Sequence, residues 1–447
     1  MTLVEQIVSH NIGRSVKAGD LVERLPITKM FMNEVIAPPA LAYFQNDFGN
    51  TLKNVDPAKQ VYDPSRIFLI PDHTVPSSSA KVSEGMDMMR EFAGKTGIKM
   101  FKEGDGVEHI LMAESGHIVA GDIVIGTDSH TDTNGAINAL SFGAGTTDAQ
   151  LAMATGFMYN FTVPKSIYFN LTGKLGLGVS GKDVILYIIG MLGAQGCSKM
   201  VAEFGGKGIA SLNMDDRFSM ANMCVEMSAR TGIFEYDDEI DKYINATGTQ
   251  WDSFKSNFEN DLSSYEKVID IDLSAIEPMV AFPHLPANVI GISKLDEMIE
   301  RSQRESSHSF ASVTDAIVNN AYIGSCTNGR LSDLAIGARI VNDRQVHPDV
   351  NLIVIPGSRK IYNQILENGD FAKYAKAGAN LESSNCGPCF GKHMGVLSNK
   401  GKMISSSNRN YKGRMGHGSS LVFLASPATV AASAIEGKIT DPRKYLK

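Results

Sequence analysis

Cysteine and long apolar runs are both scarce in this chain, and each scarcity excludes a class of protein. Five cysteines among 447 residues do not make a disulfide framework, so we expect a reducing compartment such as the cytoplasm. No uninterrupted apolar run approaches the roughly 18 residues of a membrane span. The residues after Met1 also lack the basic and then apolar pattern of a signal peptide. We therefore expect a cytoplasmic protein without a membrane partner.

Basic residues are outnumbered by acidic ones, and the net charge of −7 argues against a nucleic-acid partner. One segment departs from this balance, because no Asp or Glu occurs between Glu382 and Glu436. Its basic residues are Lys392, Lys400, Lys402, Arg409, Lys412 and Arg414. A solvated basic loop would have this composition, but a cationic, acid-free segment also suits a small anionic ligand such as a di- or tricarboxylate.

Three of the cysteines stand in patterns typical of metal sites. Cys326 lies in Gly-Ser-Cys-Thr-Asn-Gly-Arg, and Cys386 and Cys389 are separated by two residues, a spacing that lets both thiolates reach one metal centre. Structural zinc sites and ordinary iron–sulfur clusters take four protein ligands. Three cysteines therefore indicate a metal or cluster with one open position, where substrate chemistry can happen. Cys197 and Cys224 have no close cysteine neighbour, and we expect them in the core.

Short apolar runs alternate with helical stretches, which predicts an α/β fold. The expected strands include 66–70, 122–125, 321–323 and 351–355, with a helix over 331–340. Polar groups follow several of these strands, at the ends where open α/β sheets bind ligands. The polar, acidic composition of residues 245–272 predicts an excursion of the chain over the protein surface. We predict three α/β domains around a central cleft, covering residues 1–165, 166–285 and 286–447.

Acid–base candidates follow two of the strands. Asp72 precedes His73 and can orient it, although a structural histidine would show the same pair. Asp128, Ser129 and His130 stand together after the second strand, where they can orient a proton donor and bind carboxylate oxygens.

A buried helix and a basic loop contribute further candidates. Ser219, Asn222 and Glu226 have the spacing of one helical face, and the residues between them are apolar. A carboxylate on a buried helix usually has a partner or a function. Arg409 and Arg414 stand five residues apart in a Gly-containing loop, and they form the best carboxylate clamp in the sequence.

Taken in order, these segments resemble the aconitase superfamily over essentially the whole chain. The resemblance is greatest to the large subunits of the two-subunit isopropylmalate isomerase and homoaconitase group. The matching segments are Asp72-His73, Gly126 to Thr131, Gly324 to Arg330, Cys386 to Cys389, and Ser407 to Arg414.

The resemblance implies a cofactor and a set of site residues. Cys326, Cys386 and Cys389 would hold one [4Fe–4S] cluster, with one iron not bound by cysteine. The catalytic residues would be Asp72, His73, His109, Asp128, His130 and Glu226, and the substrate-binding residues Asn33, Ser129, Arg409 and Arg414. Asn222 and Asn408 would lie near the cluster.

The implied activity is that of a hydro-lyase which dehydrates and rehydrates a 2-hydroxy di- or tricarboxylic acid. We expect the interconversion of 3-isopropylmalate and 2-isopropylmalate in leucine biosynthesis. Homoaconitate, 2,3-dimethylmalate and methylmalate-type acids stay open as alternatives, because Thr131 to Gly135 departs from the isopropylmalate pattern. An iron-sensing RNA-binding protein is a remote alternative that the acidic charge disfavours.

The resemblance also implies a partner. Single-chain aconitases carry a catalytic serine and another arginine in a loop of a further C-terminal swivel domain. Here Gly418-Ser419-Ser420 is superficially like that loop, but it follows the arginine loop too closely to form a separate domain. We therefore expect a small subunit with this swivel domain and its serine to complete the site.

Overall fold

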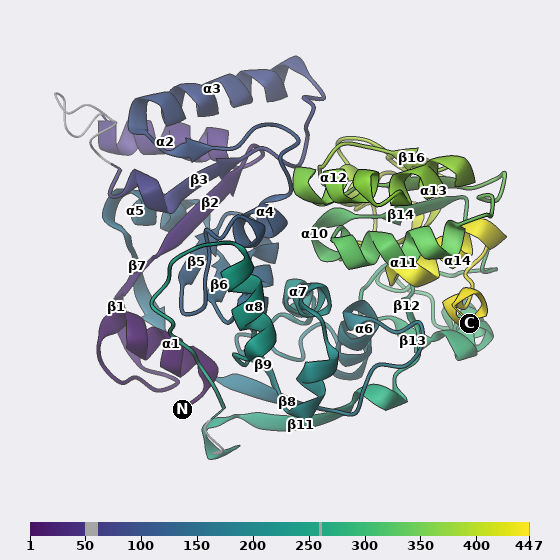
Figure 1. The fold of residues 1–447 in the computed structure, drawn as a ribbon, viewed down its shortest axis with the longest axis horizontal. Coiled ribbons are helices and arrows are strands. Elements are labelled where there is room, and N and C mark those ends of the chain that lie inside the picture. Colours follow the sequence, from purple (N-terminus) through teal and green to yellow (C-terminus); the bar gives the residue numbers. More distant parts are fainter. Residues whose placement is uncertain (50–60, 259–261, 447) are drawn as a thin grey trace.

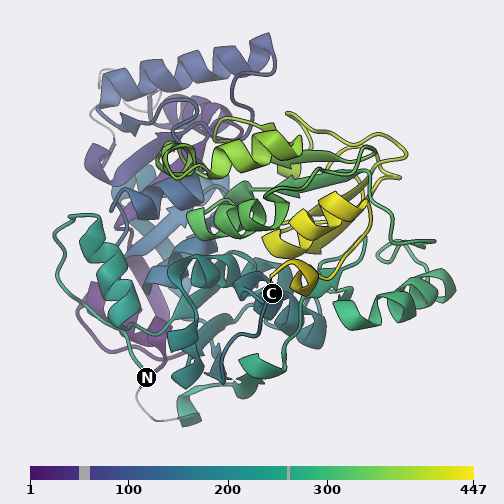
Figure 2. The ribbon, with the colours of Figure 1, turned by 45° about the vertical axis from the view of Figure 1, so that its right-hand side comes forward.

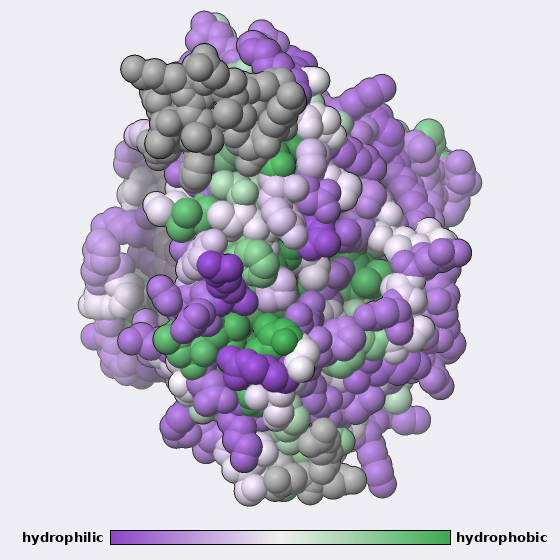
Figure 3. Space-filling model, turned by 90° about the vertical axis from the view of Figure 1, so that its left-hand side faces the viewer, coloured by the Kyte–Doolittle hydropathy of each residue, from purple (hydrophilic) through white to green (hydrophobic). Residues whose placement is uncertain are grey.

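The computed structural model describes residues 1–49, 61–258 and 262–446, and within them the strands form four sheets (Figure 1). Three of the sheets are built from successive stretches of the sequence, and the fourth is a two-stranded antiparallel ribbon. The ribbon pairs β1 (Leu21–Pro26) with β7 (Phe157–Thr162). Figure 3 shows the side of the molecule on the left of Figure 1, where apolar surface occurs in patches between hydrophilic surface.

The first large sheet is parallel, with strand order β4-β3-β2-β5-β6. Its strands are β2 (Lys29–Asn33), β3 (Ile67–Ile70), β4 (Lys99–Met100), β5 (Ile123–Gly126) and β6 (Leu140–Gly143). Every residue of β3 and β5 is buried, as expected for parallel strands covered on both faces. These two strands confirm the α/β prediction, and their carboxyl ends lie at one edge of the sheet.

The helices of this N-terminal part are α1 (Leu3–Ile12), α2 (Ala37–Gly49), α3 (Ala80–Thr96), α4 (Glu108–Glu114) and α5 (Thr146–Thr155). α2 and α3 lie side by side at the top of Figure 1. A long 3-10 segment, η3 (Ser129–Ile137), follows β5 and is almost entirely buried.

The second sheet is also parallel, with order β10-β9-β8-β11. Its strands are β8 (Ser166–Thr172), β9 (Val201–Gly205), β10 (Thr231–Phe234) and β11 (Lys267–Asp272). The helices between them are α6 (Gly181–Leu192), α7 (Met214–Asn222) and α8 (Asp238–Ala246). The surface excursion expected over 245–272 therefore ends in an edge strand, whose charged residues conceal its pairing with β8. Residues 259–261 of that prediction lie outside the described part of the chain.

The single helix expected through Ser219, Asn222 and Glu226 is interrupted. α7 ends at Asn222, and Glu226 lies in a separate 3-10 turn, η5 (Cys224–Met227). The Val225 amide donates to Asp132 Oδ2 at 3.1 Å instead of continuing the helix. A tertiary hydrogen bond thus redirects the chain, and Glu226 points to a different part of the site from Ser219.

The third sheet has order β13-β12-β18-β17-β14-β15-β16. Its strands are β12 (Met279–Ala281), β13 (Val289–Gly291), β14 (Asn320–Ile323), β15 (Asn351–Val354), β16 (Asn380–Leu381), β17 (Lys402–Ser405) and β18 (Leu421–Ala425). β12 pairs antiparallel with β13 and β18, and the other pairs are parallel. The helices are α9 (Leu295–Arg304), α10 (Ser325–Asn328), α11 (Leu331–Val341), α12 (Arg359–Glu367), α13 (Asp370–Ala377) and α14 (Pro427–Glu436). Figure 2 shows α11 in green beside the yellow α14.

The division into three domains at residues 165 and 285 stays a prediction, and β12 joins the third sheet from just before the second boundary. Among the described residues, no helix combines the length and the hydrophobicity that a membrane span needs.

Candidate active site

The three predicted cysteine ligands lie in short turns that follow strands of the third sheet. Cys326 lies in α10, directly after β14. Cys386 directly precedes the 3-10 turn η9 (Gly387–Phe390), and Cys389 lies within it. Gly324 (φ 155°) and Ser325 (φ 71°) adopt unusual backbone angles that turn the chain sharply after β14. The three side chains are 5–6% exposed, and all three cysteines are free thiols.

The surroundings of these sulfurs fit a cluster held by thiolates. Two amides donate toward Cys326 Sγ, from Asn222 Nδ2 at 3.2 Å and from Asn408 Nδ2 at 3.3 Å. Asn408 Oδ1 also lies 3.5 Å from Cys389 Sγ, so one side chain touches two of the three sulfurs. N–H groups directed at sulfur stabilise cluster thiolates. Burial raises the pKa of Cys326 and of Cys386, which makes a bound cation the natural partner of their ionised forms.

Asp72 and His73 stand beside this sulfur site. His73 Nδ1 lies 2.5 Å from Asp72 Oδ1, and one ligand atom from each of Asp72, His73 and Cys386 fits within 4.8 Å of the others. Burial lowers the pKa of His73, but the charge and hydrogen bond of Asp72 outweigh it and raise this pKa well above its ordinary value. The imidazole next to Cys386 therefore holds a proton.

Asp128 is a shared acceptor for the two other predicted histidines. Its Oδ1 lies 3.1 Å from His109 Nε2 and 3.3 Å from His130 Nδ1. Burial raises the pKa of Asp128, but hydrogen bonds from the two histidines reverse this and hold it well below its ordinary value. Burial lowers the pKa of His109 despite Asp128, so this imidazole is neutral near pH 7.

Glu226 joins the second sheet's side of the site to the arginine loop. Its Oε1 accepts from Arg409 Nε at 2.7 Å and lies 3.0 Å from His130 Nε2, and its Oε2 accepts from the Tyr411 hydroxyl at 3.0 Å. Burial raises the pKa of Glu226, but these partners lower it below its ordinary value. Glu226 is therefore a buried, ionised carboxylate that fixes Arg409.

Arg414 and Ser129 differ from Arg409 in having no such partner. Within the described residues, Arg414 makes no ion pair, its buried Nε has no hydrogen-bond acceptor, and its guanidinium lies 5.7 Å from the centre of the Phe390 ring. The same ring contacts His73 edge-on, with centroids 5.3 Å apart. The half-buried Ser129 hydroxyl makes no side-chain hydrogen bond to a described residue. Both groups are thus available to an external ligand.

Asn33, the weakest of the predicted substrate contacts, is 1% exposed at the end of β2. Its Nδ2 donates to Glu108 Oε1 at 2.8 Å, and its Oδ1 accepts from the Val35 and Ile36 amides. Its role in substrate binding stays a prediction, and in this structure its side chain holds Glu108.

Glu108 is a site residue that the sequence pattern does not single out. It is fully buried, and its Oε2 has no hydrogen-bond partner among the described residues. Burial, followed by the charges of Asp72 and Asp128, raises the pKa of Glu108 well above its ordinary value. In the sequence, Glu108 is marked only by its position before His109. That position does not indicate that Glu108 lies near other acids.

Glu34 is a second residue that sequence reasoning missed. It accepts hydrogen bonds from the backbone amides of Asp72, His73 and Thr74 and so fixes the turn after β3. Nothing in its local sequence signals this, because Glu34 and Asp72 are 38 positions apart in the chain.

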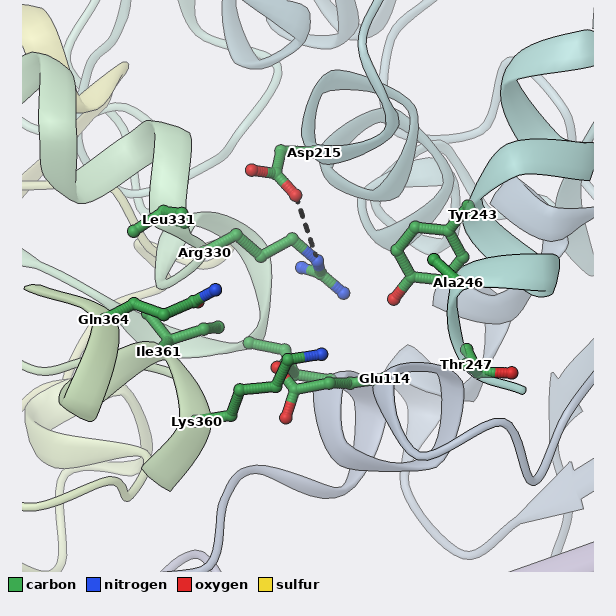
Figure 4. Close-up of a pocket in the computed structure, with 11 residues that line it drawn as sticks. Glu114, Asp215, Tyr243, Ala246, Thr247, Arg330, Leu331, Lys360, Ile361 and Gln364 are labelled. Carbon is green, nitrogen blue, oxygen red and sulfur yellow. Dashed lines mark ion pairs between the residues drawn. The ribbon is translucent and has the colours of Figure 1, made fainter. Parts of the chain in front are cut away.

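Arg330 supports the site from behind the cysteine turn. Its Nη1 donates to the Cys326 carbonyl at 2.8 Å, and its Nη2 donates to the His109 carbonyl at 3.4 Å. Figure 4 shows its guanidinium in a pocket of about 160 Å³ between Asp215 and Glu114, with Asp215 Oδ1 3.9 Å from Nε. One buried arginine therefore ties the third sheet's cysteine turn to α4 of the first part.

Comparison with known proteins agrees with this arrangement. The model of the aconitase family (aconitate hydratase) matches residues 5–437. The chain is 42% identical to the 3-isopropylmalate dehydratase large subunit of Caldanaerobacter subterraneus and 43% identical to that of Clostridium botulinum, with 99% of each chain covered in both comparisons. It is 40% identical to the corresponding subunit of Moorella thermoacetica over the full length of both chains.

The fold also matches a solved structure. Aconitase X from Thermococcus kodakaraensis superposes with a TM-score of 0.50 at 12% identity, covering 93% of this chain and 92% of that one. This chain belongs to the aconitase family. The expected aconitase-like α/β fold is confirmed.

Proposed function

We propose that this chain is the large subunit of a 3-isopropylmalate dehydratase, a hydro-lyase of leucine biosynthesis. Identity of 40–43% over nearly the whole length of curated large subunits with this name supports the substrate. The observation that carries the reaction class is the position of the protonated His73 next to Cys386, which packs with Cys326, while Asn408 contacts the sulfurs of both Cys326 and Cys389.

The proposed cofactor is one [4Fe–4S] cluster on Cys326, Cys386 and Cys389, with one iron free of cysteine. When bound, such a cluster supplies a Lewis acid for the leaving hydroxyl group. The donor amides of Asn222 and Asn408 suit this assignment, because both lie against Cys326 Sγ.

The proton chemistry is assigned to the chain's own residues. Loss of water from a 2-hydroxy acid needs a proton donor at the departing hydroxyl. We assign this donor to His73 Nε2, because Asp72 occupies Nδ1 and keeps the ring protonated. Asp128 Oδ2 lies 3.7 Å from this Nε2, and Asp128 with His130 and the neutral His109 can hold a proton on return.

Substrate carboxylates are assigned to the arginine loop. Arg414 pairs with no carboxylate of the described residues, so it can bind one from the substrate. Arg409 is already fixed by Glu226 and offers its remaining N–H groups in a set direction. Ser129 is assigned as an additional hydrogen-bond donor. These charges would also stabilise the carbanion-like intermediate.

The base that removes the carbon-bound proton is not among the assigned groups. We propose that a small subunit with a swivel domain supplies it as a serine, and that the two chains act as a heterodimer in the cytoplasm. This chain alone would then hold a cluster but turn over slowly.

The test is an anaerobic substrate panel. The chain is purified with its small subunit, and each candidate diacid is followed by the ultraviolet absorbance of its unsaturated product. We expect turnover of isopropylmalate. Turnover of homoaconitate, 2,3-dimethylmalate or a methylmalate-type acid instead would keep the mechanism and overturn the substrate. No turnover of any diacid by an iron-loaded complex would overturn the proposed reaction.

A further inference from the structure

Lys182 is a completely buried cation that the proposed chemistry does not use. It lies at the start of α6, and its side chain is 0% exposed, among the largest fully buried side chains of the described residues. Its Nζ donates to the Ser406 carbonyl at 2.9 Å and to the Ser407 carbonyl. A buried ammonium group needs partners, and one without an opposite charge is costly to keep.

No carboxylate in the described chain neutralises Lys182 by direct contact, because no ion pair within 4.0 Å involves it. The adjacent Asp183 is engaged elsewhere, since its Oδ1 accepts from the Met279 amide and its Oδ2 from the Ser180 amide. Asp183 therefore acts on Lys182 through space and not by contact. Among the described residues, the direct partners of the ammonium are two backbone carbonyl groups and no carboxylate.

The cysteine ligands lie close to the turn that Lys182 holds, because Asn408 directly follows Ser407 and its Nδ2 lies 3.3 Å from Cys326 Sγ. Burial lowers the pKa of Lys182 to about 7, and the groups that oppose this are Asp183, Cys389, Asp333 and Cys326, in that order. Two of these four are predicted cluster ligands. A [4Fe–4S] core with three thiolates has a net negative charge, so a bound cluster would provide the counter-charge that Lys182 lacks.

The two acceptors of Lys182 also belong to the substrate loop. Ser406 and Ser407 directly precede Asn408, whose amide touches Cys326 Sγ and Cys389 Sγ. Arg409 follows and pairs with Glu226. Hydrogen bonds to the carbonyls of Ser406 and Ser407 therefore fix the start of the turn that carries Asn408 and Arg409.

We propose that Lys182 is a positioning residue with two linked roles: its buried ammonium is the counter-charge of the cluster, and it clamps the turn that holds Asn408 and Arg409. This inference rests on the proposed function, because it needs a cluster on Cys326, Cys386 and Cys389. A positive charge near a cluster favours its reduced form, so Lys182 raises the reduction potential.

Two substitutions separate the roles. Lys182→Gln removes the charge and keeps an N–H donor for the carbonyls, whereas Lys182→Met removes both. The matched controls are Lys174→Met, an exposed lysine just before α6, and Ile185→Val, a buried change on α6 itself. Ile185→Val reports what simple loss of packing in this helix does to the cluster.

The test uses the full chain, purified without air with its cluster, and measures iron content and reduction potential. In both Lys182 variants we expect the reduction equilibrium to fall by about tenfold, which is 59 mV for a one-electron couple. Neither control should shift. Hydrogen exchange of residues 406–409 should speed up more in Lys182→Met than in Lys182→Gln, because only the latter keeps the clamp.

Each of the following results would overturn one of the two roles proposed for Lys182. An unshifted potential in Lys182→Gln, at full iron content, overturns the counter-charge role. A Lys182→Gln chain that does not fold shows a purely structural role and also overturns it. Equal hydrogen exchange in both variants overturns the clamp. If the wild-type chain binds no iron, the proposed function fails first, and this is visible before any variant is made.

Discussion

The first sheet brings acids and imidazoles to the site, whereas the third brings the cysteine sulfurs and the Asn408 amide, and α7 beside the second sheet adds the Asn222 amide. Around Asp72, His73 and Asp128 the groups have charged neighbours; Asp72 outweighs burial and raises the pKa of His73, whereas burial outweighs Asp128 and lowers the pKa of His109. Around Cys326 the polar contacts come from Asn222 and Asn408, which do not titrate. Charge pairs on one side of the site hold protons, and on the other side uncharged donors surround the sulfurs of the proposed cluster.

The difference teaches how one site holds acid and metal together. Ionised carboxylates next to the sulfurs would compete for iron, while amides favour thiolates without competing. Asp72 and His73 are the exceptions that join the two sides, since one ligand atom of each lies within 4.8 Å of Cys386 Sγ, and the carboxylate is paired with the imidazole. The sharpest tests change one side and leave the other intact.

The largest expected effect is on the sulfur side. Cys386→Ser should leave a folded chain that retains almost no cluster and shows background activity, because two cysteine ligands do not hold a cluster. Iron content and circular dichroism check this. Cys197→Ser, at a buried cysteine of the hydrophobic core, is the matched control and should keep its iron. Full iron in Cys386→Ser would contradict the ligand assignment.

On the charged side, His73→Gln should lower kcat by about 10²–10⁴-fold, the range for loss of a general acid. Its iron content should stay normal. Because the pKa of His73 is raised, the wild-type enzyme should keep this acid protonated through neutral pH and lose activity only as the pH rises through that higher pKa.

His117→Gln provides the comparison for His73, because His117 contacts Lys99 and Phe68 rather than an acid of the site. It should leave kcat unchanged. An equal loss in both histidine variants would count against a specific role for His73.

A smaller effect is expected at the free arginine. Arg414→Lys keeps the charge but loses the two-pronged geometry for a carboxylate. We expect KM for the hydroxy diacid to rise about tenfold with kcat less affected, since hydrogen bonds to charged groups contribute about 1.5–3 kcal/mol. Steady-state kinetics of the complex measure it, and Arg14→Lys, at an exposed arginine, should match wild type. An unchanged KM would remove Arg414 from the substrate clamp.

The smallest effect concerns the stability of the charged side. The pKa of Glu108 is raised in the folded chain, so the folded state binds more protons than the unfolded state above about pH 4.3. Its contribution to the free energy of unfolding therefore decreases as the pH rises from there toward the raised pKa. Because the Glu108→Gln side chain cannot ionise, this variant does not lose this stability. In the wild type, the loss is about 1 kcal/mol for each unit by which the pKa is raised.

Denaturant unfolding of the iron-free chain at pH 5 and pH 8 measures this difference. The stability of Glu108→Gln relative to wild type should be greater at pH 8. Glu300→Gln, at an exposed ion-paired carboxylate, should show little change. A relative stability of Glu108→Gln that falls with pH would mean that Glu108 is ionised in the folded chain.

Local sequence was enough for the strands and for most candidate residues. The apolar runs before Asp72, Asp128 and Cys326 became β3, β5 and β14, within one residue of the expected limits at most ends. The spacing of Cys386 and Cys389 and the acid-free loop with two arginines were visible for the same reason: both signals lie within a few neighbouring residues.

Other features needed contacts that no local pattern contains. The break between Asn222 and Glu226 follows from a hydrogen bond to Asp132, and the turn that carries His73 is fixed by Glu34. The edge strand β11 was missed because its charged residues resemble those of a loop. In each case, the deciding partner lies far away in the chain.

The sequence by itself determined the α/β class, the cysteine set and the residue types available for acid–base work. Only the tertiary structure decided their states: Glu108 and Glu226 are both buried glutamates, yet the pKa is raised for one and lowered for the other. The physical reason is that burial disfavours charge on both, while only Glu226 meets Arg409, His130 and Tyr411. The same distinction pairs Arg409 with Glu226 and leaves Arg414 without an ion pair among the described residues.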